Sequence, residues 1–300
     1  MSARLSGCPA PAKLNTFLHV VGRREDGYHL LQSHFRLINW SDTLDFVRRD
    51  DGRICRTHEL PGVPESADLT LRAAHLLQSR LGTPYGVDIT LHKVLPTGAG
   101  LGGGSSDAAT TLIALNRLWQ GGLSRAQLME LGLQLGADVP FFLFGEDAFV
   151  EGIGERLTPY PGPERWFLIL WPGVNVPTSR VFASPRLTRN TPIGTIASLA
   201  TTPPRNDLEP VVRELFPEVD AALEWLARHA GAARMSGSGS CVFAEFAEPS
   251  EAERIAAEVP SGWQAKVVRT LHRHPLHDWI WAPLRTGYLG SRQAGQGTGF

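Results

Sequence analysis

The sequence predicts an α+β fold with two domains, and three features of the chain lead to this prediction. The chain has 300 residues, of which 42% are hydrophobic and 20% are charged, so it is long enough to bury a substantial core in each of two domains. Its first half is rich in strand-like segments, with helix-like segments grouped after them. Its second half holds a smaller set of strand and helix patterns, which favours α+β over a doubly wound parallel sheet.

The first half contains the clearest elements, each read from the spacing of its apolar residues. Apolar or alternating β-prone runs predict strands at residues 14–21, 29–39, 43–47, 87–93 and 148–151. Leucine and alanine at helical spacing predict helices at residues 68–81, 105–119 and 124–135. The tripeptide Asp50-Asp51-Gly52 has the composition of a hairpin turn, which would lead into a further strand at 53–57.

The second half begins after a proline-rich loop and ends in a polar tail. The same patterns predict a strand at 166–171, a helix at 219–229, a strand at 241–246, a helix at 250–258 and a strand at 264–269. Residues 159–163 include three prolines, and we place the domain boundary there. The predicted domains are therefore 1–158 and 159–285. The Gly, Gln and Ser content of 286–300 predicts a disordered tail.

The segment from Leu95 to Ala109, LPTGAGLGGGSSDAA, is the most informative stretch of the chain. Glycine permits positive φ and lets the backbone come close to a ligand. A helix that begins directly after such a loop presents unpaired N–H groups and the positive end of its dipole. Together these features predict an anion site, and for a loop of this length the expected anion is the phosphate chain of a nucleotide. A flexible glycine turn capped by Ser105 or Ser106 is the simpler alternative.

Two other phosphate-binding patterns fit this loop less well. No lysine follows the glycines, so the GxxxxGK[ST] pattern is absent. A GxGxxG spacing does occur at Gly98, Gly100 and Gly103. A dinucleotide-binding fold also needs an acidic residue about twenty residues later, where this chain has the loop 120–124. A nicotinamide dinucleotide site is therefore disfavoured.

Charge and cysteine content narrow the range of partners and compartments. The formal net charge is −1, so no overall field attracts nucleic acid or an anionic membrane. No apolar run reaches about 18 residues, and the N-terminus lacks an apolar signal core. The widely spaced Cys8, Cys55 and Cys241 fit reduced thiols better than disulfides or a zinc site. We expect a cytoplasmic protein with no nucleic-acid partner and no membrane association.

Two charged residues are candidate catalytic groups. Lys13, in the run PAPAKLN, is either a solvated strand end or a cation that stabilises negative charge developing on a hydroxyl or phosphate. Asp138, in GADVPFFL, precedes Pro140, so a helix N-cap is one interpretation. Its strongly apolar neighbours favour another, because a carboxylate held among them needs a partner. Lys13 would be a suitable partner, and a substrate hydroxyl a suitable target.

Three further segments have two interpretations each. Tyr28 and His29 follow the charged turn 23–26, and they form either an exposed hairpin or a stacking and hydrogen-bonding platform for a flat base. The serine–glycine run 236–240 is either a tight hairpin or a second phosphate or substrate loop facing the first. The histidines of HRHPLH, residues 272–277, could hold a metal, but the proline-interrupted spacing favours a surface segment.

These motifs resemble those of the GHMP kinases, which include galactokinase, homoserine kinase, mevalonate kinase and phosphomevalonate kinase. PTGAGLGGGSSDAA is similar to the phosphate-binding motif of that superfamily. Four other runs are similar to the branch that phosphorylates a cytidine diphosphate-linked methylerythritol in non-mevalonate isoprenoid synthesis: PAKLNTFLHVVGRREDGYHLLQS, LGADVPFFLFGEDAFVEGIGERLTP, PGVNVPTSRVF and SGSGSCVFAEF. The resemblance covers about residues 11–246. It implies the two-domain α+β GHMP kinase fold, with an N-terminal domain like domain 2 of ribosomal protein S5 and a ferredoxin-like C-terminal domain.

The resemblance also implies roles for individual residues. Asp138 matches the catalytic aspartate of the family, and Lys13 its partner lysine. The positions matching the ATP-binding loop are Pro96, Gly98, Gly100, Leu101, Gly102, Gly103, Gly104, Ser105 and Ser106. The positions matching the substrate pocket are Asn15, Tyr28, His29, Asp138, Thr178 and Phe182. His29 is expected to read cytosine and Tyr28 to help enclose the ligand. Asp68 stands where the family often has asparagine, so no adenine contact is assigned to it.

The resulting hypothesis is phosphoryl transfer from ATP to an alcohol. Backbone N–H groups from Gly100 to Ser106 hold the β- and γ-phosphates, with Mg²⁺ bridging the phosphate oxygens near Ser105 or Ser106. Asp138 accepts the proton of the methylerythritol 2-hydroxyl, and Lys13 offsets charge on the emerging alkoxide.

Two alternatives remain open from the sequence, and neither is favoured. One is a GHMP kinase with a mevalonate-type or homoserine-type acceptor, which the platform at Tyr28 and His29 disfavours because those acceptors carry no cytosine. The other is a nucleotide-binding module without catalysis, which the presence of both Lys13 and Asp138 disfavours. We expect a monomer or a weak homodimer.

Overall fold

The structure is a computed structural model that describes residues 3–281, and within them the chain forms two β-sheets. The six-stranded sheet contains β1 (Arg4–Arg23), β2 (His29–Arg49), β3 (Ile54–Arg56), β4 (Gly86–His92), β5 (Ala148–Gly152) and β6 (Arg156–Pro159). The four-stranded sheet contains β7 (Trp166–Trp171), β8 (Arg234–Met235), β9 (Val242–Phe246) and β10 (Gln264–Arg269). The strand orders are β3-β4-β2-β5-β6, with β1 paired to β2, and β10-β7-β9-β8.

Helices pack against both sheets. Besides the short 3₁₀ helix η1 (Glu65–Ala67), they are α1 (Leu69–Leu81), α2 (Gly103–Leu118), α3 (Arg125–Leu135), α4 (Val139–Phe144), α5 (Thr178–Ala183), α6 (Ile196–Thr201), α7 (Glu209–Leu215), α8 (Pro217–Ala230), α9 (Pro249–Ala256) and α10 (His277–Trp281). The predicted helices at 68–81, 105–119 and 124–135 are confirmed as α1, α2 and α3. Side chains of α1 to α4 share one core with the first sheet, and those of α7, α8 and α9 share another with the second.

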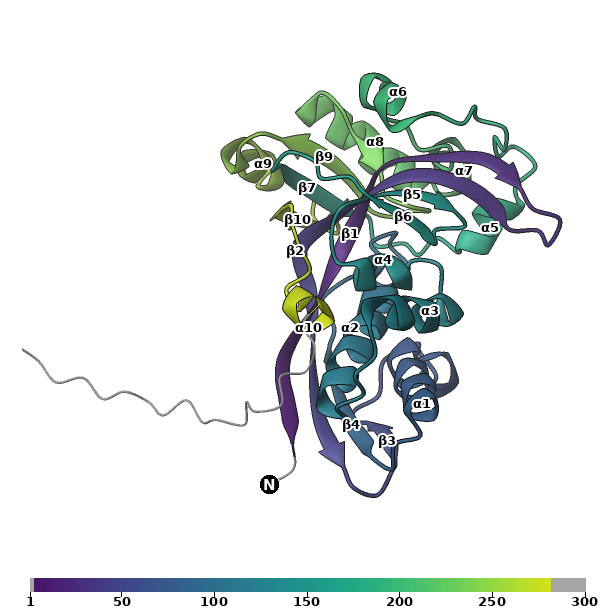
Figure 1. Cartoon of the computed structure of the whole chain (residues 1–300). Helices are drawn as coiled ribbons and strands as arrows, with labels where there is room; N and C mark the ends of the chain where they lie inside the picture. The colour runs from purple at the N-terminus through teal and green to yellow at the C-terminus, as the bar shows by residue number, and fades with distance from the viewer. Residues whose placement is uncertain (1–2, 282–300) are drawn as a thin grey trace, which may run out of the picture.

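The long antiparallel hairpin of β1 and β2 runs through both halves of the molecule (Figure 1). β1 contains Pro9 and Pro11, which lack an N–H group, and it pairs with β2 alone in the first sheet, where such residues are tolerated. The pairing shifts register on either side of the segment 13–15. Bulges of this kind change the direction of side chains, and this one lies at the start of the candidate site.

The second sheet has the ferredoxin-like arrangement that the family resemblance implied. Its order β10-β7-β9-β8 places the first strand of the unit between the last and the third. α8 lies in the connection from β7 to β8, and α9 in the connection from β9 to β10. This is the β-α-β-β-α-β arrangement of that fold. The α+β class is therefore confirmed in both sheets.

A third core cluster joins the two sheets directly below the glycine-rich loop. Leu14 of β1 packs there with Phe167 and Phe243 of the second sheet, and Ala99 and Leu101 of the loop belong to the same cluster. All five side chains are buried. Burial of this apolar surface fixes the loop relative to both sheets, so the loop has little freedom to move as a flexible turn would.

The predicted hairpin at Asp50-Asp51-Gly52 is wrong, although the chain does turn there. β4 lies between β2 and β3, pairing antiparallel with β2 and parallel with β3. Gly52 has φ +73°, and Asp51 accepts a hydrogen bond from the backbone N–H of Arg53. The local composition therefore specified a reversal of the chain. The strand that pairs with β3, however, is the later strand β4 and not β2.

The prediction that residues 272–277 form a surface segment is also wrong for His274, which is buried. His274 is 1% exposed, its backbone N–H donates to the carbonyl of Gly145, and its Nδ1 accepts from the N–H of Leu276. His272 is exposed.

Within residues 3–281 no helix is both long enough and apolar enough to cross a bilayer. The boundary at 158/159 stays a prediction, and the predicted tail at 286–300 lies outside the described residues.

Candidate active site

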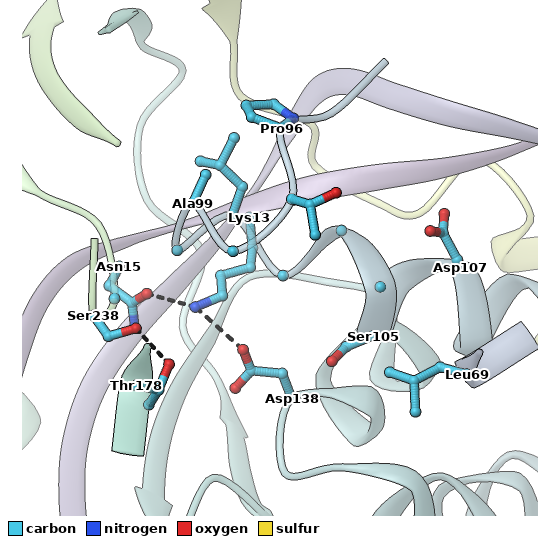
Figure 2. Close-up of a pocket in the computed structure, with 18 of the residues that line it drawn as sticks. Lys13, Asn15, Leu69, Pro96, Ala99, Ser105, Asp107, Asp138, Thr178 and Ser238 are labelled. Carbon is cyan, nitrogen blue, oxygen red and sulfur yellow. Dashed lines mark hydrogen bonds and ion pairs between the residues drawn. The ribbon is translucent and has the colours of Figure 1, made fainter. Parts of the chain in front are cut away.

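A cavity of about 410 Å³ lies where the glycine-rich loop, the start of α2 and the β1–β2 hairpin meet the second half of the chain. Nearly all the residues singled out in the sequence line it, from Lys13 in β1 to Phe182 in α5. Figure 2 shows that they come from segments far apart in the sequence. Tyr28, His29 and Ser106 are the predicted site residues that do not line it.

The glycine-rich loop adopts the backbone conformation that its composition predicts. Gly98, Gly100 and Gly102 have φ values of +64°, +77° and +71°. Residues that carry a Cβ atom rarely adopt such positive φ values. Gly102 is the N-cap of α2, and no side chain caps the helix there. The alternative of a turn capped by Ser105 or Ser106 is therefore wrong. The first N–H groups of α2 instead face a cavity, as an anion site requires.

The serine–glycine run at 236–240 is a tight turn packed against the first loop. The Ser236 hydroxyl donates to the carbonyl of Gly100 at 2.9 Å, and the N–H of Cys241 donates to that of Ala99 at 3.0 Å. Gly237 and Ser238 line the same cavity, so the tight turn faces the first loop, and its role as a second phosphate or substrate loop stays a prediction. The Ser238 hydroxyl is 2.8 Å from that of Thr178 in α5 (Figure 2).

Lys13 and Asp138 form an ion pair at the floor of the cavity. The Nζ atom of Lys13 is 3.4 Å from Oδ2 of Asp138 and donates to Oδ1 of Asn15 at 2.5 Å (Figure 2). It also lies 4.4 Å from the centre of the Phe35 ring. The ammonium is buried, whereas the Asp138 side chain is 34% exposed. Asp138 occupies the N-cap position of α4, as the N-cap interpretation predicted, but its side chain makes no capping hydrogen bond.

His29, one of the two residues of the predicted base platform, packs against Phe182 of α5. Phe182 lines the cavity, and the His29 ring lies 4.8 Å from the Phe182 ring, centre to centre. Burial lowers the pKa of His29, and the nearby cations Arg189 and Arg23 lower it further. Tyr28 is 60% exposed at the tip of the hairpin. The structure thus brings His29 and Phe182 together but leaves Tyr28 in solvent.

Comparison with known proteins identifies the family. Residues 68–146 match the model of the GHMP kinases N terminal domain, and residues 187–265 match that of the GHMP kinases C terminal. The two matches together cover more than half of the chain. The chain belongs to the GHMP kinase family.

Several relatives share a more specific name. This GHMP kinase is 58% identical to the 4-diphosphocytidyl-2-C-methyl-D-erythritol kinase of Azoarcus sp. (strain BH72), over 92% of the chain and 98% of that protein. It is 54% identical to the protein of that name from Cupriavidus metallidurans, over 91% and 95%. A crystal structure of 4-(cytidine 5'-diphospho)-2C-methyl-D-erythritol kinase matches with a TM-score of 0.75 at 35% identity, covering 89% of this chain and 99% of that one. A homoserine kinase structure from Cytophaga hutchinsonii shares the fold at 18% identity, with a TM-score of 0.66.

Sequence reasoning missed a charged cluster that borders the cavity of this GHMP kinase near α1. Lys93 donates to Asp42 at 2.5 Å and to Asp107 at 2.7 Å. Asp42 also accepts the backbone N–H groups of Val94 and Leu95, so the cluster ties the segment before the glycine loop to β2 and α2. Burial raises the pKa of Asp107 to about 7. The sequence signal that could have revealed this cluster was Asp107, an aspartate inside the glycine-rich motif itself.

Asp68 has a structural role in this kinase. Its carboxylate accepts hydrogen bonds from the N–H groups of Thr70 and Leu71 and caps α1, and its other oxygen lies 3.3 Å from Nη1 of Arg56. An N-cap of this kind stabilises a helix by about 1 kcal/mol. The carboxylate also borders the cavity, and its capping bonds account for an aspartate at this position.

Proposed function

We propose that this GHMP kinase transfers the γ-phosphoryl group of ATP to the 2-hydroxyl of 4-diphosphocytidyl-2-C-methyl-D-erythritol, giving the 2-phosphate and ADP in non-mevalonate isoprenoid precursor synthesis. The observation that carries phosphoryl transfer is the carboxylate of Asp138, which pairs with a buried ammonium in the same cavity as the glycine-rich loop. The names of the near-full-length relatives support this acceptor.

ATP is assigned to the glycine-rich loop. Its β- and γ-phosphates lie against the backbone N–H groups from Gly100 to Ser106, where the dipole of α2 favours negative charge. The loop is held from behind by Ser236, so the amides are oriented before ATP arrives. Preorganised donors need no rearrangement during the reaction, which is the main source of their catalytic effect.

Mg²⁺ is assigned to the region between the loop and Asp138. Ser105 and Asp138 both line the cavity (Figure 2), whereas the hydroxyl of Ser106 is buried away from it. The hydroxyl of Ser105 would hold this ion, which usually takes few protein ligands and is otherwise bound by substrate phosphates and water. When bound, the ion neutralises charge on the phosphate oxygens.

Asp138 is assigned as the general base and Lys13 as the group that stabilises the acceptor oxygen. The 34% exposure of the Asp138 side chain leaves its carboxylate open to a substrate hydroxyl. Proton transfer from that hydroxyl to Asp138 develops negative charge on the attacking oxygen, and the buried ammonium of Lys13 is close enough to offset it. General base catalysis contributes about 10²–10⁴-fold in rate, or about 3–5 kcal/mol of barrier.

The cytidine diphosphate part of the acceptor is assigned to the side of the cavity near α5. Thr178 and Phe182 line this side, and His29 packs on Phe182. An imidazole can hydrogen-bond the edge of a base, and Phe182 and Tyr28 can stack on its faces. Asn15, which accepts from Lys13, is assigned to the methylerythritol end.

A panel of acceptors tests this proposal. The purified full chain is incubated with ATP, Mg²⁺ and one of four acceptors: 4-diphosphocytidyl-2-C-methyl-D-erythritol, its uridine analogue, mevalonate or homoserine. ADP release is measured by a coupled assay, and phosphorus NMR locates the new phosphate. We expect acceptor-dependent ADP release with the cytidine compound and a phosphate on its 2-oxygen. Turnover of mevalonate or homoserine instead, or ATP binding with no acceptor-dependent ADP release, would contradict the proposal.

A further inference from the structure

The guanidinium of Arg189, in the loop after α5, connects the two residues assigned to base recognition. Its Nε donates to Nε2 of His29 at 3.0 Å. Its Nη2 donates to the carbonyls of Phe182 at 2.9 Å and Ser184 at 2.7 Å, and its Nη1 donates to that of Leu187 at 3.1 Å. All three guanidinium nitrogens are therefore engaged, and the group is held in one orientation.

This contact determines which nitrogen of His29 carries the proton. Arginine is a donor only and stays charged in proteins, so Nε2 of His29 must offer its lone pair to Arg189. The ring is then neutral, and its single proton is on Nδ1. Burial and the charges of Arg189 and Arg23, the cations that act on this ring, lower the pKa of His29 and disfavour its doubly protonated form.

The same guanidinium also fixes the aromatic wall beside this histidine. Phe182 lies at the end of α5, and its carbonyl is one of the acceptors of Arg189. The rings of Phe182 and His29 are 4.8 Å apart and inclined by 30°. Arg189 thus holds a stacking surface and a hydrogen-bonding ring together, although His29 and Phe182 belong to different halves of the chain.

We propose that Arg189 is a positioning residue for base recognition, which fixes His29 as an Nδ1–H donor beside Phe182. Within residues 3–281, Nδ1 of His29 has no hydrogen-bond partner. The subsite therefore takes a pyrimidine that presents an acceptor, a ring nitrogen or a carbonyl oxygen, at its edge. Cytosine has both. The identity of the base rests on the proposed function. The tautomer of His29 rests only on its contact with Arg189.

Removing Arg189 should weaken acceptor binding to an extent that depends on pH. A purely structural defect would weaken binding equally at all pH values. Without Arg189 the neutral ring distributes its proton between Nδ1 and Nε2, so the donor at Nδ1 is present only part of the time. The doubly protonated ring always carries a proton on Nδ1. A variant without Arg189 should therefore bind the acceptor better below the usual imidazole pKa of about 6.5 than above it.

Nitrogen NMR of the ligand-free wild-type protein tests the tautomer directly. The chain is labelled with ¹⁵N-histidine, and His29→Gln identifies the signal by removing it. We expect Nδ1 to be protonated and Nε2 unprotonated at about pH 8. A proton on Nε2 would overturn the proposal. This measurement uses no substrate, so it is independent of the acceptor panel, whose failure would contradict the proposed function alone.

Kinetics of Arg189→Met test the role of the contact. At about pH 8 we expect KM for the cytidine acceptor to rise about tenfold, with kcat and KM for ATP within about twofold of wild type. At about pH 5.5 the ratio of variant to wild-type KM should fall to about threefold or less. An equal ratio at both pH values, or an equal rise in KM for ATP, would overturn the proposal. Arg186→Met is the matched control, because Arg186 is exposed and pairs with Glu214.

Discussion

The ammonium of Lys13 lies 3.4 Å from the carboxylate of Asp138, with the first group buried and the second one-third exposed. Lys13 belongs to the bulged part of the edge strand β1, and Asp138 to the turn before α4. The asymmetry in burial matters for function. A buried cation keeps its charge unscreened by water, while the partly open carboxylate can receive a proton from a substrate.

Replacing Asp138 by asparagine should abolish the base while keeping the shape of the site. We expect Asp138→Asn to lower kcat by about 10²–10⁴-fold and to leave KM for ATP nearly unchanged, because the Asp138 side chain makes no capping hydrogen bond and its amide analogue fits the same space. Steady-state kinetics with the cytidine acceptor provide the measurement. Asp278→Asn is the control, since Asp278 is fully exposed. A near-normal kcat would remove Asp138 from the mechanism.

Replacing Lys13 by methionine should act on the same step. The methionine keeps most of the buried apolar length but removes the charge, so we expect kcat to fall by about 10²-fold or more. The partly exposed Asp138 can be hydrated after the change, so the protein should stay folded by circular dichroism. Lys266→Met, at an exposed position of β10, should have no effect on kcat. If both lysine variants behave alike, Lys13 has no special role.

The close packing of the two glycine-containing loops makes Gly100 sensitive to substitution. A Cβ on Gly100 would lie 2.1 Å from the carbonyl oxygen of Ser236. We expect Gly100→Ala to destabilise the protein by about 2–5 kcal/mol through strain and overpacking and to impair ATP binding. Gly122 is the matched control: it also has positive φ, but nothing lies within 4 Å of its Cβ position.

Urea unfolding and ATP titration of both glycine variants make this comparison. Gly122→Ala should cost about 1–2 kcal/mol and leave ATP binding intact. Equal destabilisation by the two substitutions would mean that positive φ alone, rather than the contact between the loops, constrains Gly100.

Substitution of His29 should change KM for the cytidine acceptor but not KM for ATP. Because the His29 ring packs on Phe182 and is assigned to the base of the acceptor, we expect His29→Ala to raise KM for the cytidine acceptor by about tenfold. KM for ATP should change little. The exposed His75 of α1 provides the control substitution. Equal effects on both KM values would argue against base recognition at His29.

The buried His34 should make the protein less stable in mild acid. Burial, and next the charge of Arg36, lower the pKa of His34 to about 4 from 6.5. A depressed histidine pKa in the folded state means that the neutral ring is favoured by folding. This contribution is present above the unfolded pKa and is lost as pH falls through the window between the two values.

From about pH 7.5 to about pH 5 the expected loss from His34 is about 2 kcal/mol. Urea unfolding at the two pH values measures it. His34→Gln should reduce the loss by that amount, whereas His75→Gln, at an exposed position, should leave it unchanged. An unaltered pH dependence in His34→Gln would show that this ring does not titrate on unfolding.

Local patterns predicted much of the fold because their physical causes are local. The helical spacing of leucines in α1 and the glycines before α2 act within a few residues of chain, and both elements were predicted nearly to their ends. The turn at Asp50-Asp51-Gly52 was also local, but its strand pairing was not. β4 provided a better partner for β3 than β2 did, and a short segment holds no information about a strand that comes later.

The sequence by itself determined the helical and strand periods, the phosphate-type loop and, through resemblance, the identities of Lys13 and Asp138. Only the tertiary structure decided that these two side chains meet, that Ser236 supports Gly100, and that Arg189 reaches His29. Backbone periodicity arises from neighbours along the chain, so it can be read from residue order. Contacts between distant segments depend on how two sheets and their cores pack, and residue order alone does not specify that packing.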